Sequence, residues 1–595
     1  MRKNICKKAL VVILAAGFVM SSLAGCGNES ATDTATSKQE STTTAAFTDY
    51  TYDEYAAEAD DCDSAYTTSA ADSSAMNSAA SSSQSAYKRS GKNSIVPEYE
   101  NDKDWYSPDT REYSHNAEND FIATAKENVS TFAADVDTAS YSNLRGYLRD
   151  GSMIPEDAVR IEEMINYFHY NYDEPQKGEP FSVNMEVDGC PWNPDHQLVM
   201  IGLKAKAIKE SERKPTHFVF LIDTSGSMDS SDKLPLVKCA YVKLLNELDE
   251  NDTVSIVTYA GYDTVVLEGE NGANTDVIAN AIENLQASGS TNGSAGINTA
   301  YEIAEKYYKK RGNNRVILAT DGDLNVGVTR EDDLIELISE KKESGIFLSV
   351  LGFGNDNLKD NKLEALADNG NGNYAFIDSV YEAKRVLVRE MGSTLETVAK
   401  DVKLQTTFDE SVVEKYRLIG YENRMLAKED FDNDAVDGGE IGSGHEVTAL
   451  YEIVPTKDAD ISGRSGKNHI LDLSIRYKEP KADDSKLLKY SCQYSKKGFD
   501  NEASDNMLWA ESVACFGMYL KGSDYSGKST IDLARSLAEM TSYKKDRLRV
   551  EYLDLLDQAE YIYGSYRGNM DDDYDPYYDD YSDYDDTEIN IIEAD

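Results

Sequence analysis

The middle of the chain, residues 216–397, shows the most regular alternation of hydrophobic patterns. Short apolar runs rich in β-branched and aromatic residues alternate there with amphipathic stretches of helical spacing. The runs predict buried strands at residues 217–223, 253–260, 315–322, 346–354 and 374–378. The amphipathic stretches predict helices at residues 233–248, 275–285, 298–310, 331–342, 361–369 and 381–396. Strands and helices in this order predict right-handed βαβ units and an α/β domain with an open, doubly wound, mostly parallel sheet.

Alternating apolar and polar positions on both sides of this domain predict further β-strands. They lie at residues 181–190 and 198–207 before the domain, and at residues 401–408, 416–421, 445–455 and 469–480 after it. A two-stranded hairpin alone is marginal in water, so we expect the strands from both sides to pack into one shared β-rich unit. The α/β domain would then be an insertion in that unit.

Helical patterns complete the two flanking parts. In the N-terminal segment, residues 120–210, helices are predicted at residues 129–151 and 154–170, the second opened by Pro155. The C-terminal domain, residues 398–566, begins with the β pattern and ends in a helical region. That region is predicted at residues 506–523, 530–544 and 548–563. We find no internal repeat of roughly 20 to 50 residues, which disfavours a solenoid or a propeller.

Both ends of the chain lack the apolar residues that a core needs. Residues 27–119 are mainly Ser, Thr, Ala, Asp and Tyr, and they bury too little apolar surface to offset the entropy of ordering. We interpret them as a disordered tether. The acidic tail rich in Tyr and Asp, residues 571–595, would stay extended through the repulsion of its charges. The tail would either bind cations or a basic partner, or only keep this end of the chain solvated.

The charge balance excludes one class of partner. The chain of 595 residues has 60 Lys and Arg against 108 Asp and Glu, which gives a formal net charge of -48. Electrostatic binding of nucleic acid needs clustered basic residues, so we expect no nucleic-acid partner. The length allows about three or four domains.

Residues 1–26 have the organisation of an export signal. Basic residues precede an apolar run, residues 9–20, which is too short to span a membrane. The sequence LAGC that follows, ending at Cys26, resembles the lipobox of bacterial lipoproteins. The resemblance implies that Cys26 carries a diacylglyceryl group and begins a mature chain anchored to the cell membrane on its extracytoplasmic face. The alternative is an ordinary secretory signal that ends in a Cys by chance.

The remaining cysteines do not have the pattern of a disulfide framework or of a zinc site. Apart from Cys6 and Cys26 they are Cys62, Cys190, Cys239, Cys492 and Cys515. Cys239 lies in a helical pattern and is interpreted as a small buried apolar residue. A bridge between Cys492 and Cys515 is left open as an alternative for an exported protein.

Three polar loops of the α/β domain lie where a doubly wound sheet brings loops to one edge. The first is the sequence DTSGS, residues 223–227, at the end of the first strand of the domain. The others are the glycine-rich residues 288–293, which contain Thr291, and residues 320–323, which contain Asp321. Their carboxylate and hydroxyl oxygens suit a hard divalent ion with octahedral coordination. The sequence therefore predicts a Mg²⁺ site, with Mn²⁺ as the second choice.

These motifs resemble the metal-ion-dependent adhesion site (MIDAS) of von Willebrand factor type A (VWA) domains, a family with the same doubly wound fold. The resemblance rests on D-x-S-x-S, a downstream Thr in a glycine-rich loop and a later T-D-G. It implies that Ser225, Ser227 and Thr291 contact the metal through their hydroxyls. Asp223 and Asp321 would act directly or through water, and a carboxylate of a partner protein would fill the open position. The alternative is a domain without metal, in which these side chains only cap helices.

The flanking parts resemble a narrower family, the bacterial exported VWA proteins similar to YfbK. The resemblance lies in residues 135–151, 158–168 and 190–206 before the domain and in residues 417–452 after it. It extends over nearly all of residues 121–563. It implies this architecture, with a C-terminal domain of no assigned function, rather than an activity.

Other motifs are weaker. Residues 522–529 match the phosphate loop G-x-x-x-x-G-K-S, but they follow a helical pattern where the motif requires a strand, so we interpret them as an interhelical turn. Glu162 and Glu163 are interpreted as helix surface and core rather than as a catalytic pair. No H-E-x-x-H and no G-x-S-x-G elbow occurs, and no nucleophile stands with a base, so we expect no enzyme.

The favoured hypothesis is a non-enzymatic, surface-anchored adhesion or ligand-capture protein. It would use the metal of its VWA domain to bind an Asp or Glu carboxylate of a partner protein. The alternative hypothesis is a scaffold or assembly factor of an envelope complex, in which the metal only orders the loops. Retention of a partner with and without a chelator separates the two.

Overall fold

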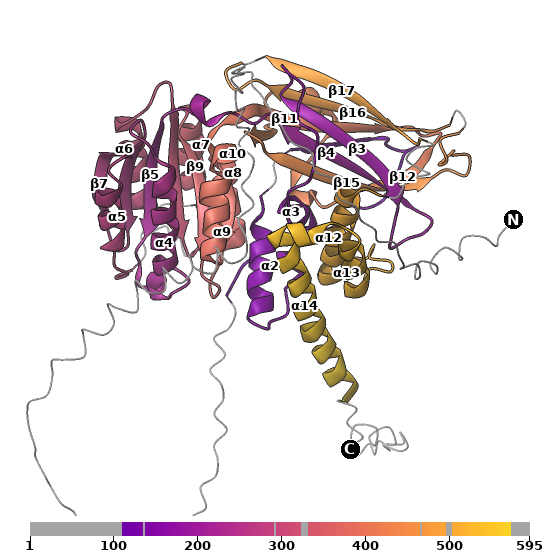
Figure 1. Cartoon of the computed structure of the whole chain (residues 1–595). Helices are drawn as coiled ribbons and strands as arrows, with labels where there is room; N and C mark the ends of the chain where they lie inside the picture. Colours follow the sequence, from indigo (N-terminus) through magenta and orange to yellow (C-terminus); the bar gives the residue numbers. More distant parts are fainter. Residues whose placement is uncertain are drawn as a thin grey trace, which may run out of the picture. The chain divides into compact units, whose positions relative to one another are not determined.

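The computed structural model describes residues 110–572 except for 135–136, 291–292, 323–330, 465–466, 483 and 496–502. Within this part the chain forms three β-sheets with helices packed against them (Figure 1). The predicted signal peptide, nearly all of the tether and nearly all of the acidic tail lie outside the described residues. None of the described helices combines the length and the apolar composition needed to cross a membrane.

The central sheet confirms the predicted doubly wound fold. Its strands, in spatial order, are β10 (Tyr374–Ile377), β9 (Phe347–Phe353), β8 (Asn313–Thr320), β5 (Thr216–Asp223), β6 (Thr253–Tyr259) and β7 (Asp263–Asn271). Neighbouring strands are parallel except for the antiparallel pair β6 and β7. The chain runs outward from β5 to β6 and β7 and then crosses back to β8. The strand order therefore reverses beside β5, the place where such sheets bind ligands.

The edge strand β7 was not predicted. Most of its side chains are exposed or half-buried, so it lacks the continuous apolar run that marks the buried strands. Its pairing with β6 is irregular, with register shifts on both sides of Ile256. This strand forms because it pairs with β6 in a hairpin, and not because its side chains are buried.

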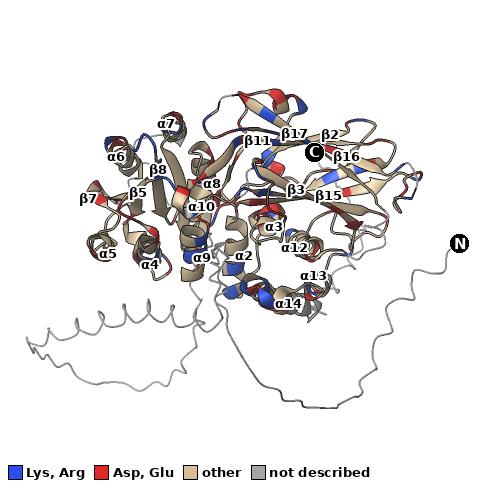
Figure 2. Cartoon of the chain, turned by 45° about the horizontal axis from the view of Figure 1, so that its top comes forward, with Lys and Arg blue, Asp and Glu red and all other residues tan. Residues whose placement is uncertain are grey.

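Helices cover both faces of the central sheet, as expected. They are α4 (Leu234–Leu244), α5 (Thr275–Glu283), α6 (Gly293–Lys306), α7 (Glu331–Glu343), α8 (Asp360–Asn369), α9 (Val380–Lys384) and α10 (Met391–Leu395), with a π-helical turn, η5 (Arg385–Arg389), between the last two. Figure 2 shows α4 and α5 on one side of the sheet and α6 and α7 on the other. Phe218 and Phe220 of β5 pack on the side of α4 and α5. Val219 and Leu221 pack on the side of α6, so β5 is buried on both faces.

Two antiparallel sheets contain strands from both sides of the inserted domain. One consists, in spatial order, of β1 (Ile122–Ala123), β12 (Val413–Ile419), β15 (Glu446–Pro455), β4 (Gln197–Ala205) and β3 (Phe181–Gly189). The other consists of β13 (Met425–Leu426), β2 (Val129–Ala133), β11 (Thr397–Phe408), β16 (His469–Lys478) and β17 (Ser485–Gln493), and β14 (Gly439–Gly442) also pairs with β11. The pairs β4–β15 and β2–β11 each join a strand that precedes the domain to one that follows it.

The two antiparallel sheets share one hydrophobic core. Ile201 and Tyr451 of the first sheet belong to the same buried cluster as Leu404 and Leu473 of the second. The apolar positions that alternate along these strands therefore face a common interior. This confirms that the β-strands before and after the inserted domain form one β-rich unit.

The helix predicted at residues 129–151 is wrong in its first part. Residues Val129–Ala133 form β2, and α2 (Ala139–Arg149) begins only at Ala139. The stretch contains β-branched and aromatic residues, and its pairing with β11 and β13 decides its conformation. The helix predicted at residues 154–170 is shorter than expected and consists of a 3₁₀ turn, η1 (Glu156–Ala158), and of α3 (Ile161–Asn166). The aromatic residues that follow α3 leave the helix and pack into the core between the helices.

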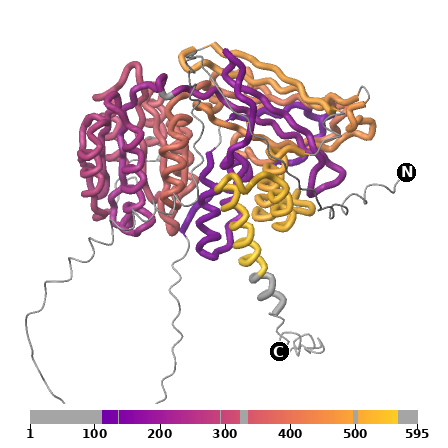
Figure 3. The backbone as a smooth tube through the Cα atoms, in the orientation of Figure 1, coloured from indigo at the N-terminus to yellow at the C-terminus, as the bar shows by residue number. Residues whose placement is uncertain are grey.

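The predicted C-terminal helices are present as α12 (Asp505–Lys521), α13 (Ile531–Glu539) and α14 (Arg547–Asp572). They pack with α2 and α3 around buried aromatic residues, among them Phe168, Trp509 and Tyr552. Figure 3 shows α2, in indigo, beside α14, in yellow. Arg149 of α2 and Glu551 of α14 form an ion pair of 2.6 Å across this contact. The N-terminal segment is therefore joined to the end of the C-terminal domain.

The cysteines of the C-terminal domain lie in separate cores. Cys492 is buried in the core of the two antiparallel sheets and Cys515 in the helical core, and both are free thiols. The bridge between them that the sequence left open is not formed. Cys239 is buried in α4, as its helical pattern predicts, but it is disulfide-bonded and not a free thiol.

Glu511 of α12 is a buried carboxyl for which the described residues provide no ion pair. It is 1% exposed, and its Oε1 atom has no hydrogen-bond partner in the described part of the chain. Burial raises its pKa well above the ordinary value of 4.5, and the charges of Asp188 and Glu186 act in the same direction. Burial therefore favours the protonated form of Glu511.

Replacing Glu511 by glutamine is expected to stabilise the protein increasingly as the pH rises. A carboxyl with a raised pKa contributes its full stability below the ordinary pKa and loses it as the pH rises toward the folded-state pKa. Relative to E511Q, the wild type should lose about 1.4 kcal/mol of unfolding free energy per pH unit in this range. Urea unfolding between about pH 5 and pH 7 measures the difference, with the exposed Glu539→Gln as control. The same pH dependence in wild type and E511Q would contradict this expectation.

Candidate metal site

Two carboxylates meet at the carboxyl edge of the central sheet. Asp223 is the last residue of β5, and Asp321 comes directly after β8, the parallel neighbour of β5. Both side chains are buried. Because parallel strands end at the same edge, the places of D-x-S-x-S and T-D-G in the chain already bring these two groups together.

The hydrogen bonds of Asp223 organise the loop after β5. Its Oδ1 accepts from the backbone N–H of Ser225 at 2.8 Å, and its Oδ2 accepts from the hydroxyl of Thr320 at 3.2 Å. The Oγ atoms of Ser225 and Ser227 are 3.0 Å apart. Burial raises the pKa of Asp223 to about 6, and the negative charge of Asp321 acts in the same direction. A bound cation would relieve the cost of burying these neighbouring carboxylates.

The glycine-rich loop before α6 lies against the loop after β5. The backbone N–H of Ser288 donates to the carbonyl of Thr224 at 2.8 Å, and the N–H of Gly226 donates to the carbonyl of Gly289 at 3.0 Å. Gly289 has a φ of 84°, a conformation that favours glycine. Thr291 follows this contact but lies outside the described residues, so its role as a metal ligand stays a prediction.

A lysine that the sequence analysis missed also belongs to the site. Lys233, just before α4, is buried, and its Nζ lies 3.2 Å from Oδ2 of Asp321 and 2.7 Å from Oδ1 of Asp356. The sequence pattern marks Lys233 only as the start of an amphipathic helix. Lysines are rarely buried, and the burial of this one depends on the loop after β9, so no local signal could have found it.

The donor set fits a hard divalent cation. Asp223, Asp321, Ser225 and Ser227 present only carboxylate and hydroxyl oxygens, the ligands that Mg²⁺ and Mn²⁺ prefer. Among the described residues no group of three or more His, Cys, Asp or Glu is arranged to hold a metal ion. Two carboxylates with hydroxyls would not make such a group, and the remaining positions suit water. Ser225 is buried whereas Ser227 is exposed, so the site opens to solvent beside Ser227.

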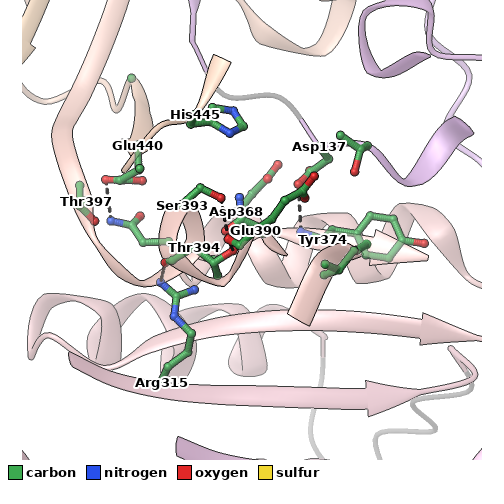
Figure 4. Close-up of a pocket in the computed structure, with 18 of the residues that line it drawn as sticks. Asp137, Arg315, Asp368, Tyr374, Glu390, Ser393, Thr394, Thr397, Glu440 and His445 are labelled. Atoms are coloured by element: carbon green, nitrogen blue, oxygen red, sulfur yellow. Dashed lines mark hydrogen bonds between the residues drawn. The ribbon is translucent and has the colours of Figure 1, made fainter. Parts of the chain in front are cut away.

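A cavity of about 90 Å³ lies at the opposite edge of the central sheet (Figure 4). Arg315 near the start of β8, Tyr374 at the start of β10 and His445 of the β-rich unit border it. Since parallel strands start at the edge opposite to their carboxyl ends, this cavity is separate from the metal edge. Its Asp368 is already paired with Arg424 at 2.6 Å. We interpret this cavity as part of the polar interface between the α/β domain and the β-rich unit.

Residues 522–529 form the turn between α12 and α13, as expected for a chance match to the phosphate loop. Gly522 ends α12 in the left-handed region with a φ of 64°. The side chain of Thr530 caps α13 by accepting from the backbone N–H of Leu533 at 3.0 Å. The strand that a phosphate loop requires does not precede this turn.

Glu162 and Glu163 are both buried, so the surface part of their predicted assignment to helix surface and core is wrong. Glu163 pairs with Arg160, which also bonds Asp360 of α8 at 2.6 Å. Burial raises the pKa of both carboxyls. The cover over α3 comes from α12, α8 and β15, elements that a local pattern cannot show.

The doubly wound sheet, with D-x-S-x-S after β5 and T-D-G after β8, defines a VWA domain. The family model described as von Willebrand factor type A domain matches residues 218–389. A model described as von Willebrand factor matches residues 107–200, and a model described as the C-terminal part of the uncharacterized protein YfbK matches residues 393–562. The chain belongs to the YfbK family of VWA proteins, since it is 37% identical to YfbK of Escherichia coli (strain K12) over 474 residues. This match covers 76% of the chain and 82% of that relative.

More distant proteins share parts of the chain. It is 31% identical over 183 residues to the uncharacterized protein sll0103 of Synechocystis, covering 31% of the chain and 42% of that protein. A von Willebrand factor type A structure from Catenulispora acidiphila has a TM-score of 0.39 at 15% identity, with 65% of this chain and 91% of that chain covered. The ArnB paralog VWA2 from Sulfolobus acidocaldarius has a TM-score of 0.33 at 15% identity, with 64% and 98% covered. The fold assignment rests on the strand order and on the family model.

The VWA domain supports a role in protein interaction or adhesion. Domains of this class are generally non-enzymatic, and they commonly bind a divalent metal. The role in protein interaction or adhesion is the coarse function that the chain shares with this class.

Proposed function

We propose that the protein is a surface-anchored adhesion or ligand-capture protein that depends on a metal ion. Its VWA domain would hold Mg²⁺, or Mn²⁺, and bind a partner protein through an Asp or Glu carboxylate at the same ion. The observation that carries the proposal is the convergence of oxygen ligands at the carboxyl edge of the central sheet. These ligands belong to Asp223, Ser225, Ser227 and Asp321.

The charge of the ligand set favours an acidic partner. When bound, a divalent ion supplies positive charge and an open coordination position for a carboxylate. Ser225 and Ser227 would contribute neutral oxygens, as would Thr291, so the carboxylates that the described residues offer to the ion are those of Asp223 and Asp321. Lys233 offsets part of the charge of Asp321. A divalent ion held by two carboxylates and neutral hydroxyls still attracts one more carboxylate, whereas an ion held by three or four acidic ligands would not.

Retention of a partner from an envelope extract, in Mg²⁺ and in EDTA, tests this proposal. The central sheet buries its own core on both faces, so chelation should release the partner without unfolding the domain. Equal retention in both conditions would leave the VWA domain as a scaffold only.

A scaffold or assembly factor of an envelope complex is the alternative function. It is favoured by buried ion pairs that fix the VWA domain to the rest of the folded part. Arg145 of α2 bonds Asp378 at 2.6 Å and Glu382 at 2.8 Å. A domain held in this way presents a rigid surface whether or not a metal is bound.

We also propose that Cys26 is lipidated and anchors the chain on the extracytoplasmic face of the cell membrane. The proposal is supported by the basic start, the apolar run and the LAGC sequence of residues 1–26. Release of the signal would leave Cys26 at the start of the mature chain, with the predicted tether between the lipid and the folded part.

Replacing Cys26 by serine is expected to move the protein from the detergent phase to the aqueous phase in a detergent partition experiment. Each methylene of a lipid chain contributes about 0.8 kcal/mol to membrane binding, so losing both chains of a diacylglyceryl group removes the anchor. Cys62→Ser, in the predicted tether, is the matched control and should stay in the detergent phase. Wild-type protein that enters the aqueous phase as readily as C26S would show that no lipid is attached.

A further inference from the structure

The side chain of Lys233 is enclosed by the loops at the metal edge of the central sheet. The side chain is 3% exposed. Gly354, after β9, has a φ of 83°, and a Cβ atom there would overlap the Cε atom of Lys233. The backbone N–H of Asn355 donates to Oδ2 of Asp232 at 3.2 Å, which ties the loop after β9 to the loop before α4. The stem of Lys233 is therefore packed in one position beside the metal edge.

The ammonium group lies between one buried and one exposed carboxylate. Its distance is 3.2 Å to Asp321, which is buried, and 2.7 Å to Asp356, whose side chain is 72% exposed. Among the described residues, Asp321 is one of two carboxylates in the candidate metal site. A metal ion and the ammonium would thus be attracted by the same buried charge, and two cations this close repel each other.

We infer that Lys233 is a built-in counter-cation of the metal site, which holds Asp321 before a metal binds and lowers the affinity for the divalent ion by competing for this carboxylate. The inference rests on the metal site of the proposed function. In this arrangement Asp321 can pair either with the ammonium of Lys233 or with the ion, and Asp356 is a second carboxylate for the ammonium. The affinity measured for the ion is then reduced by the population of the state in which Asp321 is bonded to Lys233.

Calorimetric titration of the full-length protein with Mg²⁺, in detergent, tests this inference. Lys233→Met keeps most of the stem and removes the charge, so it should bind Mg²⁺ at least about tenfold more tightly than the wild type. Asp356→Asn leaves the ammonium with Asp321 alone, and it should bind about two- to threefold more weakly because an exposed charge acts through screened water. Lys238→Met is the matched control on α4, since Lys238 donates to the carbonyl of Glu283 and should not affect the site.

A further variant, Asp223→Asn, separates this inference from the proposed function, since it should remove Mg²⁺ binding. If it does so while Lys233→Met binds no more tightly than the wild type, Lys233 is only a structural ion pair and the inference is overturned, although the metal site stands. If wild type and Asp223→Asn bind equally, or if neither the wild type nor Lys233→Met binds, the metal site itself is refuted. If circular dichroism shows that Lys233→Met does not fold, the Mg²⁺ affinity of Asp356→Asn is the test. An affinity equal to that of the wild type would then overturn the inference.

Discussion

Replacing Arg145 by methionine is expected to lower the free energy of unfolding by about 3–5 kcal/mol. The guanidinium donates through Nε and Nη2 to both carboxylate oxygens of Asp378, each at 2.6 Å. It also donates to Glu382 at 2.8 Å and to the hydroxyl of Tyr167 at 2.9 Å. Without it, two carboxylates that are 3% and 1% exposed each lose one cation where water cannot replace it, although Asp378 still pairs with Arg149 and Glu382 with Arg385.

The matched control for this change is Arg535→Met. Arg535 of α13 also pairs with several carboxylates, those of Asp532, Asp557 and Glu560. These carboxylates are exposed and stay solvated when the arginine is removed, so the loss should be below about 1 kcal/mol. Urea unfolding of both variants measures the difference. Similar losses would mean that burial does not set the strength of the pairs that hold the VWA domain to α2.

Replacing Asp223 by asparagine is expected to abolish the metal-dependent capture of the partner. The effect should exceed the roughly 10- to 100-fold loss caused by removing the hydrogen-bond partner of a metal ligand, because Asp223 is itself a candidate ligand. The asparagine carbonyl can still accept the N–H of Ser225, so the loop after β5 should keep its conformation. Because burial already disfavours the charged form of Asp223, the neutral side chain should leave the metal-free protein at least as stable as the wild type.

The control for D223N is a thermal unfolding experiment in EDTA. An unchanged or higher transition temperature together with lost capture would assign the effect to the metal. A lower transition temperature would instead mean that the charge of Asp223 is needed for folding.

The central sheet could be predicted because each of its buried strands has its own local signal. β5 is apolar at successive positions, since Phe220 faces one layer of helices and Leu221 faces the other. The elements that were missed or misassigned owe their conformation to pairing. β7 is largely exposed and exists as the partner of β6, and β2 is a strand because β11 lies beside it. Helical spacing in a short segment does not outweigh such contacts.

The candidate ligands could be predicted for a related reason. Asp223 and Asp321 each follow a strand directly, and parallel strands carry such residues to one edge whatever the length of chain between them. Lys233 and Arg145 could not be predicted in the same way, because a charged residue is exposed by default. Their burial depends on partners far along the chain, among them Asp378, and on loops whose path the sequence pattern does not show.

The most direct test of the metal bridge is the retention of a partner from an envelope extract by wild type and by D223N, each in Mg²⁺ and in EDTA. We expect retention only by the wild type in Mg²⁺, because only this combination leaves a metal ion for the partner carboxylate. Equal retention in all four conditions would contradict the metal bridge.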